Sequence, residues 1–483
     1  MQALDADTLD DTVTHRWFTG WRFVLAVTLV AAIAHLPGFI RTEVLNPDEG
    51  FLATQAQVLN DGGRLYQDVV DRKPPIVPYL YAATFRISGS DGLFGVRVLA
   101  LFAHIATALL IAAIARRRWG DGPAFAAAML YLVASAGLVV EDSQAASFEV
   151  FMLPFMCAAM YFAERDRPVA GGVAAALATL AKQVAATTML PLAYLAWRKQ
   201  RFAGVARLAV AFVVPIAIGA LLFGWSDFLF WVFTGTGSYL DASGSWSVVL
   251  NRGASGTGVF LGANLGAFLL VLGAWRRWRE DLDLWLWLIA AVIGAAAGFR
   301  FFGHYFLQLA PPFALLAAGT LVRARRADWI RTAVLGAASI VVFVVLTLSM
   351  HPNVLPRYER IAAAISQRTK PGDHIFVWGQ IPQLYWAVDR EPATRFLTSG
   401  FLTGFGGGRS AQHVGRQYAV PGAWDDFESD LAAHPPVLIV DVSSKTPKGQ
   451  EFSIDHFPEF ASYLQQHYNV VQVVDGATIY VPK

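Results

Sequence analysis

Charged residues and cysteine are both scarce in this sequence. Only 15% of its 483 residues are charged, whereas soluble domains average roughly a quarter. The hydrophobic share is 55% and the mean hydropathy is +0.44. This composition excludes an ordinary soluble protein and predicts a polytopic α-helical membrane protein. The single cysteine, Cys157, excludes an intrachain disulfide.

Basic residues are gathered in short clusters, so the formal net charge of +2 says little about the surface. Each cluster lies beside an apolar run, which is typical of cytoplasmic loops between membrane spans and argues against a nucleic-acid partner. The apolar runs between the clusters predict about eleven transmembrane helices. The four clusters are residues 116–118, 198–201, 276–279 and 323–326.

For residues 168–197, apolar length and charge bias must be considered together to predict the topology. They resemble one long span, yet positive charges flank both ends, which places both ends on the same side of the membrane. A hairpin with its apex at Lys182 and Gln183 resolves this conflict. Because a lysine facing lipid is costly, we expect Lys182 to lie against protein or substrate near the outer face.

The composition divides the chain into three parts. Residues 1–22 are polar and predict a cytoplasmic tail, and residues 23–350 predict the transmembrane domain. From residue 351 to residue 483 helix and strand patterns alternate, which predicts a soluble α/β domain on the outer side. Its strands are expected at residues 374–378, near 395–398, and at 437–442, 470–474 and 478–481.

The first outer loop, residues 41–93, holds the most distinctive polar residues. Asn46 is suited to cap a helix over residues 47–60, because Pro47, Asp48 and Glu49 are all favoured in a first turn. An apolar stripe on this helix predicts that it lies on the membrane surface. A second short helix is expected to start at Pro74 and Pro75.

Carboxylates followed by cations at a bilayer surface suit a lipid-phosphate substrate that is attacked by a neutral hydroxyl. A hydroxyl is a weak nucleophile near neutral pH and needs a general base, for which Asp48 is the candidate. The departing lipid phosphate needs fixed cations. Lys73 and Arg72 are placed for this, and Arg64 and Lys182 are further candidates.

Two motifs in this loop resemble a known family. Pro-Asp-Glu-Gly at 47–50 is followed by Lys-Pro-Pro-x-x-x-Tyr at 73–79, and the pair is similar to the GT-C membrane glycosyltransferases. The nearest branch holds the dolichyl-phosphate-mannose–protein mannosyltransferases, the lipid A aminoarabinose transferase and the lipopolysaccharide-core transferases. The resemblance covers residues 20–350, and residues 300–309 also look typical of bacterial members.

This resemblance implies an inverting transfer of a hexose or pentose from a polyprenyl-phosphate carrier. The implied acceptor is a hydroxyl on an envelope glycan, glycolipid or protein, at the outer face of a bacterial inner membrane. It also implies catalytic roles for Asp48, Glu49 and Glu149, the last matching a second acidic position of the family. Where this chain has Arg72, family members typically carry a glutamate, so the donor sugar is left open.

Several of these residues have a structural explanation as well. Asp48 and Glu149 both begin helices, where a carboxylate can simply satisfy backbone amides. Tyr79 suits the headgroup layer as an aromatic. The polar residues His304, Tyr305 and Gln308 are placed either to pack between helices or to hold the donor phosphate.

A divalent cation and two other functions stay open at this stage. Asp48, Glu49 and Glu149 offer the oxygen ligands that a hard cation prefers, although the resemblance does not require a metal. A transporter or flippase of a lipid-linked sugar would also use many spans and polar residues, but at mid-depth rather than on a surface loop. A non-catalytic membrane scaffold with an outer recognition domain is the third interpretation.

Overall fold

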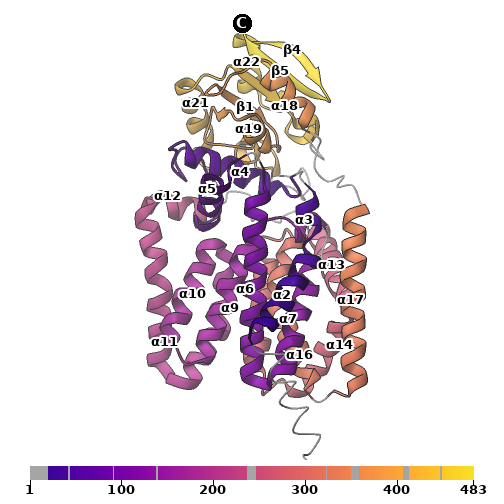
Figure 1. Cartoon of the computed structure of the whole chain (residues 1–483). Helices are drawn as coiled ribbons and strands as arrows, with labels where there is room; N and C mark the ends of the chain where they lie inside the picture. The colour runs from indigo at the N-terminus through magenta and orange to yellow at the C-terminus, as the bar shows by residue number, and fades with distance from the viewer. Residues whose placement is uncertain are drawn as a thin grey trace, which may run out of the picture.

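The structure is a computed structural model and describes residues 20–41, 44–90, 92–137, 140–235, 246–322, 324–349, 358–405, 413–445 and 449–483. Within these residues a long bundle of helices lies beneath a smaller unit that contains a sheet (Figure 1). Most of the expected cytoplasmic tail, residues 1–19, lies outside the described residues.

The bundle is built from helices contributed by residues 21–349. In chain order its α-helices are α2 (Trp21–Ala34), α3 (Pro37–Ile40), α6 (Phe94–Trp119), α7 (Asp121–Ala136), α8 (Val140–Ser143), α9 (Phe148–Glu164), α10 (Pro168–Ala181), α11 (Met189–Leu222), α12 (Trp225–Leu229), α13 (Trp246–Ala263), α14 (Leu265–Ala274), α15 (Leu282–Ala296), α16 (Ala310–Leu321) and α17 (Arg326–Ser349). Shorter turns connect them: η1 (Gln183–Thr188), the π-helix η2 (Phe230–Thr234), η4 (Trp275–Arg277) and η5 (Gly303–Leu309).

Three helical stretches among the described residues are long and apolar enough to cross a membrane alone. They are Phe94–Trp119, Gln183–Leu222 and Arg326–Leu346, and the pair Trp246–Ala263 and Leu265–Arg277, bent by 94°, could serve as a fourth span. The predicted count of about eleven crossings is therefore not confirmed. Several other apolar helices have only 10–17 residues, because breaks in the backbone divide the longer apolar runs.

The predicted hairpin at Lys182 is confirmed. Helix α10 ends at Ala181, Lys182 has an extended backbone, and the chain then turns through η1 into α11. Contacts with α9 fix the direction of both arms. Lys182 bonds to Glu149 at the start of α9, whereas the Lys199 ammonium donates to the carbonyls of Ala163 and Glu164 at its end, at 3.2 and 2.5 Å.

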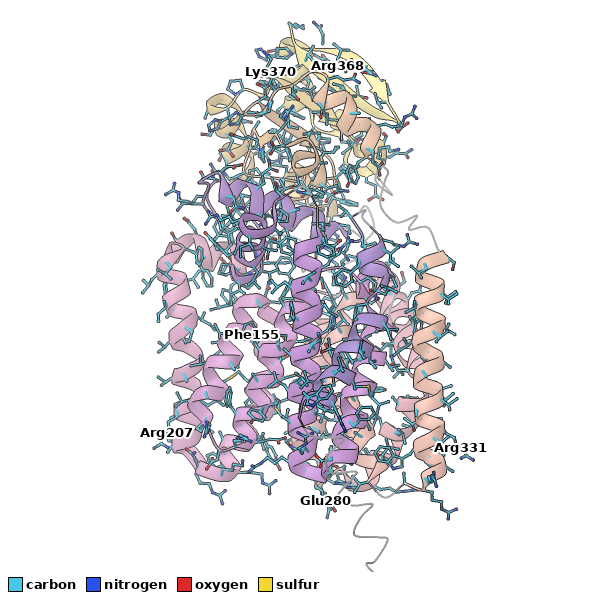
Figure 2. All side chains as sticks on the ribbon, viewed as in Figure 1. Phe155, Arg207, Glu280, Arg331, Arg368 and Lys370 are labelled. Atoms are coloured by element: carbon cyan, nitrogen blue, oxygen red, sulfur yellow. The ribbon has the colours of Figure 1, made fainter. Side chains whose placement is uncertain are left out.

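The two ends of the bundle differ in charge. The end that faces the sheet is called here the sheet end, and the opposite end, where Arg207, Glu280 and Arg331 lie in Figure 2, is called the arginine end. Arg118 is the centre of an ion-pair network there, bonding to Glu164 at 2.5 Å, to Asp281 at 3.7 Å and also to Asp283. The described basic residues of the predicted cytoplasmic loops thus share one end.

The smaller unit, residues 358–483, is called the C-terminal unit and has the predicted α/β character. Its strands pair in the order β2-β1-β3-β5-β4, with β1 parallel to both β2 and β3, and β5 antiparallel to β3 and β4. Its strands are β1 (His374–Trp378), β2 (Glu391–Pro392), β3 (Leu438–Asp441), β4 (Tyr468–Val474) and β5 (Ala477–Pro482), and its helices are α18 (Glu359–Ser366), α19 (Gln383–Val388), α20 (Gly400–Thr403), α21 (Ala423–Ala433) and α22 (Pro458–His467).

One predicted strand is wrong. Residues 395–398 form no strand, and the edge strand β2 is formed by Glu391 and Pro392 instead. The reason is that the backbone of Arg395 bonds elsewhere. Its carbonyl accepts from the Val70 amide at 3.1 Å, and its amide donates to Asp430 at 3.0 Å.

Residues 41–93, called the loop segment, lie between the bundle and the C-terminal unit. Their helices α4 (Pro47–Asn60) and α5 (Ile76–Ser88) match the predicted elements. The apolar stripe of α4 was expected to rest on the membrane surface, but Leu52 and Leu59 of this stripe are buried within the protein. Helix α19 packs on another side of α4 (Figure 1), where the Thr54 hydroxyl donates to the Pro382 carbonyl at 2.8 Å. At Gly50 an added Cβ would lie 2.9 Å from the Cβ of Gln383, so only glycine allows this approach.

The ion-pair network at the arginine end gives the first prediction. Replacing Arg118 by Met should leave three facing carboxylates without their shared cation and lower the stability by about 3 kcal/mol. The readout is the thermal unfolding midpoint in detergent. Arg279→Met, an exposed arginine of the same end, is the control and should change little. Equal midpoints for the two variants would contradict the role given to Arg118.

Candidate active site

The site is built on the first turn of α4. Asn46 has an extended backbone, and its side-chain oxygen accepts from the Asp48 amide at 2.8 Å, which confirms it as the N-cap. Pro47 occupies the first helical position, where no amide hydrogen is needed. The cap fixes where the helix begins, and therefore fixes the directions of Asp48 and Glu49.

Glu49 points into the protein. Its side chain is fully buried and receives two hydrogen bonds from Arg97, at 3.1 Å from Nε and 2.8 Å from Nη2. The backbone amides of Leu45 and Ala146 add bonds at 3.0 and 2.9 Å. Because both carboxylate oxygens are held in this way, Glu49 cannot take the catalytic or metal-binding place expected from the sequence, and its role is to anchor α4.

Asp48 points the other way, toward Lys73. The Lys73 ammonium donates to Oδ1 of Asp48 at 3.1 Å, and both side chains keep about a fifth of their surface exposed, at 22% and 23%. Burial alone would raise the pKa of Asp48. The charges of Lys73, His304 and Lys182 outweigh burial and lower that pKa to about 2. Asp48 is therefore ionised while Lys73 is paired with it.

A second carboxylate–lysine pair lies beside the first. Glu149, in the first turn of α9, is fully buried and bonds through Oε1 to the ammonium of Lys182. Its other oxygen, Oε2, has no hydrogen-bond partner among the described residues. The hairpin apex thus carries Lys182 to the same place as Lys73.

His304 joins the two pairs. Its Nε2 lies 4.0 Å from Oδ2 of Asp48 and 3.8 Å from Oε1 of Glu149. Its Nδ1 bonds to Asp142 and lies 3.4 Å from the side-chain nitrogen of Asn46. The imidazole is therefore held on one edge and presents its other edge to both carboxylates.

Aromatic rings cover the two lysines. The Lys73 ammonium lies 4.1 Å from the centre of the Phe148 ring, and the Lys182 ammonium lies 4.2 Å from the centre of the Tyr305 ring. A ring face attracts a cation without neutralising it. The rings therefore add no negative charge to the two carboxylate–lysine pairs.

Four other predicted site residues lie outside this cluster or at its margin. Arg64 is 72% exposed on its side chain and pairs with Asp68 at 3.5 Å. The Arg72 guanidinium lies over the Phe401 ring at 4.4 Å. Tyr79 is exposed and packs on Phe223, and Gln308 is buried, donating to the Tyr305 carbonyl at 3.0 Å.

Three residues of the site were not expected from the sequence. Arg97 lies within an apolar run of the sequence, where an arginine requires a buried partner. Asp142 follows another apolar run, and in the structure it holds His304. Asp71 is buried, and its Oδ2 has no hydrogen-bond partner among the described residues. Burial and, secondarily, Asp48 raise the pKa of Asp71 despite the opposing charge of Lys73.

The cluster also contains atoms that could hold a metal ion. One ligand atom each from Asp48, Glu149 and His304 lie within 4.8 Å of one another. Two carboxylate oxygens and one imidazole nitrogen suit a divalent transition metal. His304 therefore replaces Glu49 in the predicted ligand set. Each of the two carboxylates bonds a lysine through one of its oxygens, Asp48 through Oδ1 to Lys73 and Glu149 through Oε1 to Lys182.

Comparisons with known proteins show the same fold elsewhere. Residues 72–225 match the family model described as dolichyl-phosphate-mannose-protein mannosyltransferase, and no curated protein sequence matches the chain. The apo structure of ArnT from Cupriavidus metallidurans aligns with a TM-score of 0.66 at 17% identity, covering 94% of this chain and 97% of that chain. The same protein bound to undecaprenyl phosphate gives 0.61 at 15% identity, covering 95% and 97%.

A more distant likeness involves the archaeal oligosaccharyltransferase AglB from Archaeoglobus fulgidus, in complex with an inhibitory peptide and a dolichol-phosphate. It gives a TM-score of 0.52 at 11% identity, covering 95% of this chain and 74% of that chain. Together with the family match, these structures confirm the predicted resemblance to the GT-C membrane glycosyltransferases at the level of the fold.

The opposite directions of Asp48 and Glu49 give the second prediction. Glu49→Gln should lower stability by about 3–5 kcal/mol, because it leaves the Arg97 guanidinium buried beside a neutral amide. Asp48→Asn should cost much less, since its carboxylate is partly exposed. Thermal unfolding in detergent measures both. The double variant Glu49→Met with Arg97→Met should lose less stability than the two single variants Glu49→Met and Arg97→Met lose together. A double variant whose loss equals the sum of those two losses would contradict the pairing.

Proposed function

We propose that this chain, which has the fold of the GT-C membrane glycosyltransferases, transfers a sugar from a polyprenyl-phosphate carrier to a hydroxyl acceptor. One observation carries the proposal: an ionised carboxylate, Asp48, is paired with Lys73 and feels the charge of Lys182, which bonds to the neighbouring Glu149, at the end of a membrane bundle. A hydroxyl substrate needs the carboxylate and a phosphate leaving group needs the cations. The undecaprenyl phosphate bound by ArnT is a ligand of this kind.

The reaction follows from the positions of these groups. The acceptor hydroxyl gives its proton to Asp48 as its oxygen bonds to the anomeric carbon of the donor. The bond from that carbon to the phosphate oxygen breaks, and the phosphate leaves with the electron pair, stabilised by Lys73 and Lys182. Attack opposite the leaving group inverts the anomeric centre. His304 is a positioning residue here, because it lies between Asp48 and Glu149.

Donor binding is expected to raise the pKa of Asp48, which is low for a general base. A carboxylate with a pKa near 2 accepts protons poorly at neutral pH. A phosphate bound at Lys73 competes for the ammonium and adds a negative charge beside Asp48, and both effects raise the pKa of Asp48. The base is therefore strengthened when the donor is in place.

The placement of charge supports a reaction on the outer face of the membrane. The described basic loops lie at the arginine end, which the positive-inside rule assigns to the cytoplasm. Helix α4, whose first turn carries Asp48, and the C-terminal unit lie at the other end (Figure 1). This arrangement supports an extracytoplasmic position for residues 351–483. The transporter interpretation gains no support, because the polar groups gather at one end of the bundle rather than midway.

The proposed function is tested by separating donor binding from transfer. Asp48→Asn should reduce sugar transfer by about 10²–10⁴-fold, the usual contribution of a general base, while undecaprenyl phosphate still binds. Lys73→Gln should weaken that binding. The readouts are mass spectrometry of envelope glycans from complemented null cells and a binding assay on the purified chain. The control Arg86→Gln removes an exposed cation from α5 of the same loop segment. Wild-type transfer by Asp48→Asn would refute the proposal.

The pH dependence gives a further prediction. Because the pKa of Asp48 is about 2 in the free protein, the carboxylate stays ionised above that pH. Its protonation should therefore cause no acid-side loss of kcat/KM down to roughly pH 4. In the donor complex the pKa of Asp48 is raised, so kcat should fall at a higher pH than kcat/KM does. Steady-state rates across the pH range measure both quantities. Acid limbs of kcat and kcat/KM at the same pH would contradict the coupling between Asp48 and Lys73.

A further inference from the structure

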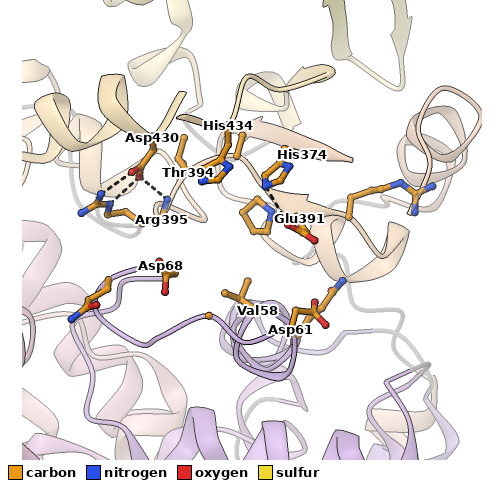
Figure 3. Close-up of a pocket in the computed structure, with 15 residues that line it drawn as sticks. Val58, Asp61, Asp68, His374, Glu391, Thr394, Arg395, Asp430 and His434 are labelled. Carbon is orange, nitrogen blue, oxygen red and sulfur yellow. Dashed lines mark hydrogen bonds and ion pairs between the residues drawn. The ribbon is translucent and has the colours of Figure 1, made fainter. Parts of the chain in front are cut away.

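Two adjoining cavities separate the loop segment from the C-terminal unit. One has a volume of about 220 Å³ and the other about 910 Å³, and Gln67, Asp68 and Arg395 line both of them. Because they share these residues, the two cavities adjoin, and together they are called here the junction groove. Figure 3 shows its smaller part, in which Asp61 at the end of α4 lies opposite Glu391 of the C-terminal unit.

The junction groove carries an excess of carboxylates. Six acidic side chains and three arginines line it, and Arg64 pairs with Asp68 at 3.5 Å. Arg395 bonds to Asp430 at 2.7 and 2.9 Å and to Asp426 at 3.2 Å. Arg390 is buried, with hydrogen bonds to Thr369 and to backbone carbonyls. The six carboxylates are Asp61, Asp68, Asp227, Glu391, Asp426 and Asp430.

Like charges also face one another across the groove. Asp61 makes no ion pair within the described part of the chain. Burial first, and then the carboxylates of Glu391 and Asp389, raise the pKa of Asp61. Beside them, His374 is stacked on His434, with ring centres 4.7 Å apart, and pairs with Glu391 at 3.1 Å. These walls offer many hydrogen-bond acceptors, which suit a ligand rich in hydroxyl or amine donors and repel an anionic ligand.

Residues 64–73 connect the wall of the groove with the active site. Tyr66 lines the larger cavity, and its hydroxyl donates to the carbonyl of Lys73 at 2.8 Å. This stretch therefore has the groove on one side and the Lys73–Asp48 pair on the other. Asp61 lies 13 residues after Asp48 on α4, a distance of about 20 Å along the helix. A ligand that reaches both places must be several sugar units long.

An extended peptide fits the groove less well. Peptides commonly bind by adding a strand to the exposed edge of a sheet. The edge strand beside this groove, β2, has only two residues, and one of them is Pro392, which has no amide hydrogen to offer. Recognition here depends on side-chain carboxylates, which is the pattern expected for a glycan.

We infer that the junction groove binds the acceptor, and that this acceptor is an oligosaccharide without phosphate or carboxylate groups. The inference rests on the proposed transferase function and adds the acceptor class and its binding site. The groove carboxylates accept hydrogen bonds from the hydroxyl or amino groups of the glycan. The end of the glycan then passes Tyr66 and presents its hydroxyl to Asp48.

The test uses null cells that express the full chain. The groove variant is Asp61→Lys with Glu391→Lys, which reverses the charge on opposite walls. The control is Glu428→Lys, an exposed carboxylate of α21 that does not line the groove. Envelope glycans and proteins are analysed by mass spectrometry, and undecaprenyl phosphate binding by the purified chain reports on the donor site.

We expect the groove variant to lose transfer by about tenfold or more, the effect of about 1.4 kcal/mol of lost binding, with donor binding and the control unchanged. If the charge reversal prevents folding, the isosteric pair Asp61→Asn with Glu391→Gln must still lose transfer. If the Asp61→Asn, Glu391→Gln variant transfers sugar at the wild-type rate while Asp48→Asn is inactive, the acceptor does not bind in the junction groove, and the proposed transferase function still stands. Sugar found on protein overturns the glycan assignment. Identical products from null and wild-type cells would overturn the proposed function itself.

Discussion

The buried pair between Glu49 and Arg97 fixes the first turn of α4, which carries Asp48. Arg97 also donates to the carbonyls of Gly38, at 2.9 Å, and of Arg41, so one guanidinium joins α3, α4 and α6. The Glu49 carboxylate meanwhile accepts from Ala146, next to the start of α9. Because successive helical residues point about 100° apart, anchoring Glu49 inward turns Asp48 outward, toward the lysines.

The fold could be predicted from the sequence where two independent signals agreed. The hairpin at Lys182 was predicted from charge bias and apolar length together, and the start of α4 was predicted from the capping residue Asn46. The span count is not confirmed, because a break in the backbone, such as the bend between α13 and α14, leaves no mark in hydropathy. The expected position of α4 was not met because an apolar stripe does not tell whether lipid or protein covers it, and here protein buries Leu52 and Leu59 of that stripe.

The sequence predicted most residues of the site individually, but it did not predict which of them contact one another. Asp48, Lys73, Glu149, Lys182 and His304 come together from five distant parts of the chain, as their chemistry suggested, and their roles remain proposals. The choice between Asp48 and Glu49 depends on Arg97. Its charge inside an apolar run was a usable signal, whereas the bond from Asp142 to His304 depends on how α8 packs against η5 and has no counterpart in the sequence.

The central claim is that Lys73 and Lys182 hold one phosphate while Asp48 faces the reacting carbon. An electron cryo-microscopy structure of the full chain with undecaprenyl phosphate tests this most directly. The account predicts the phosphate between the two ammonium groups, with Lys73 shifted from Asp48 toward it. A phosphate bound away from both lysines, with the Lys73–Asp48 pair intact, would contradict it.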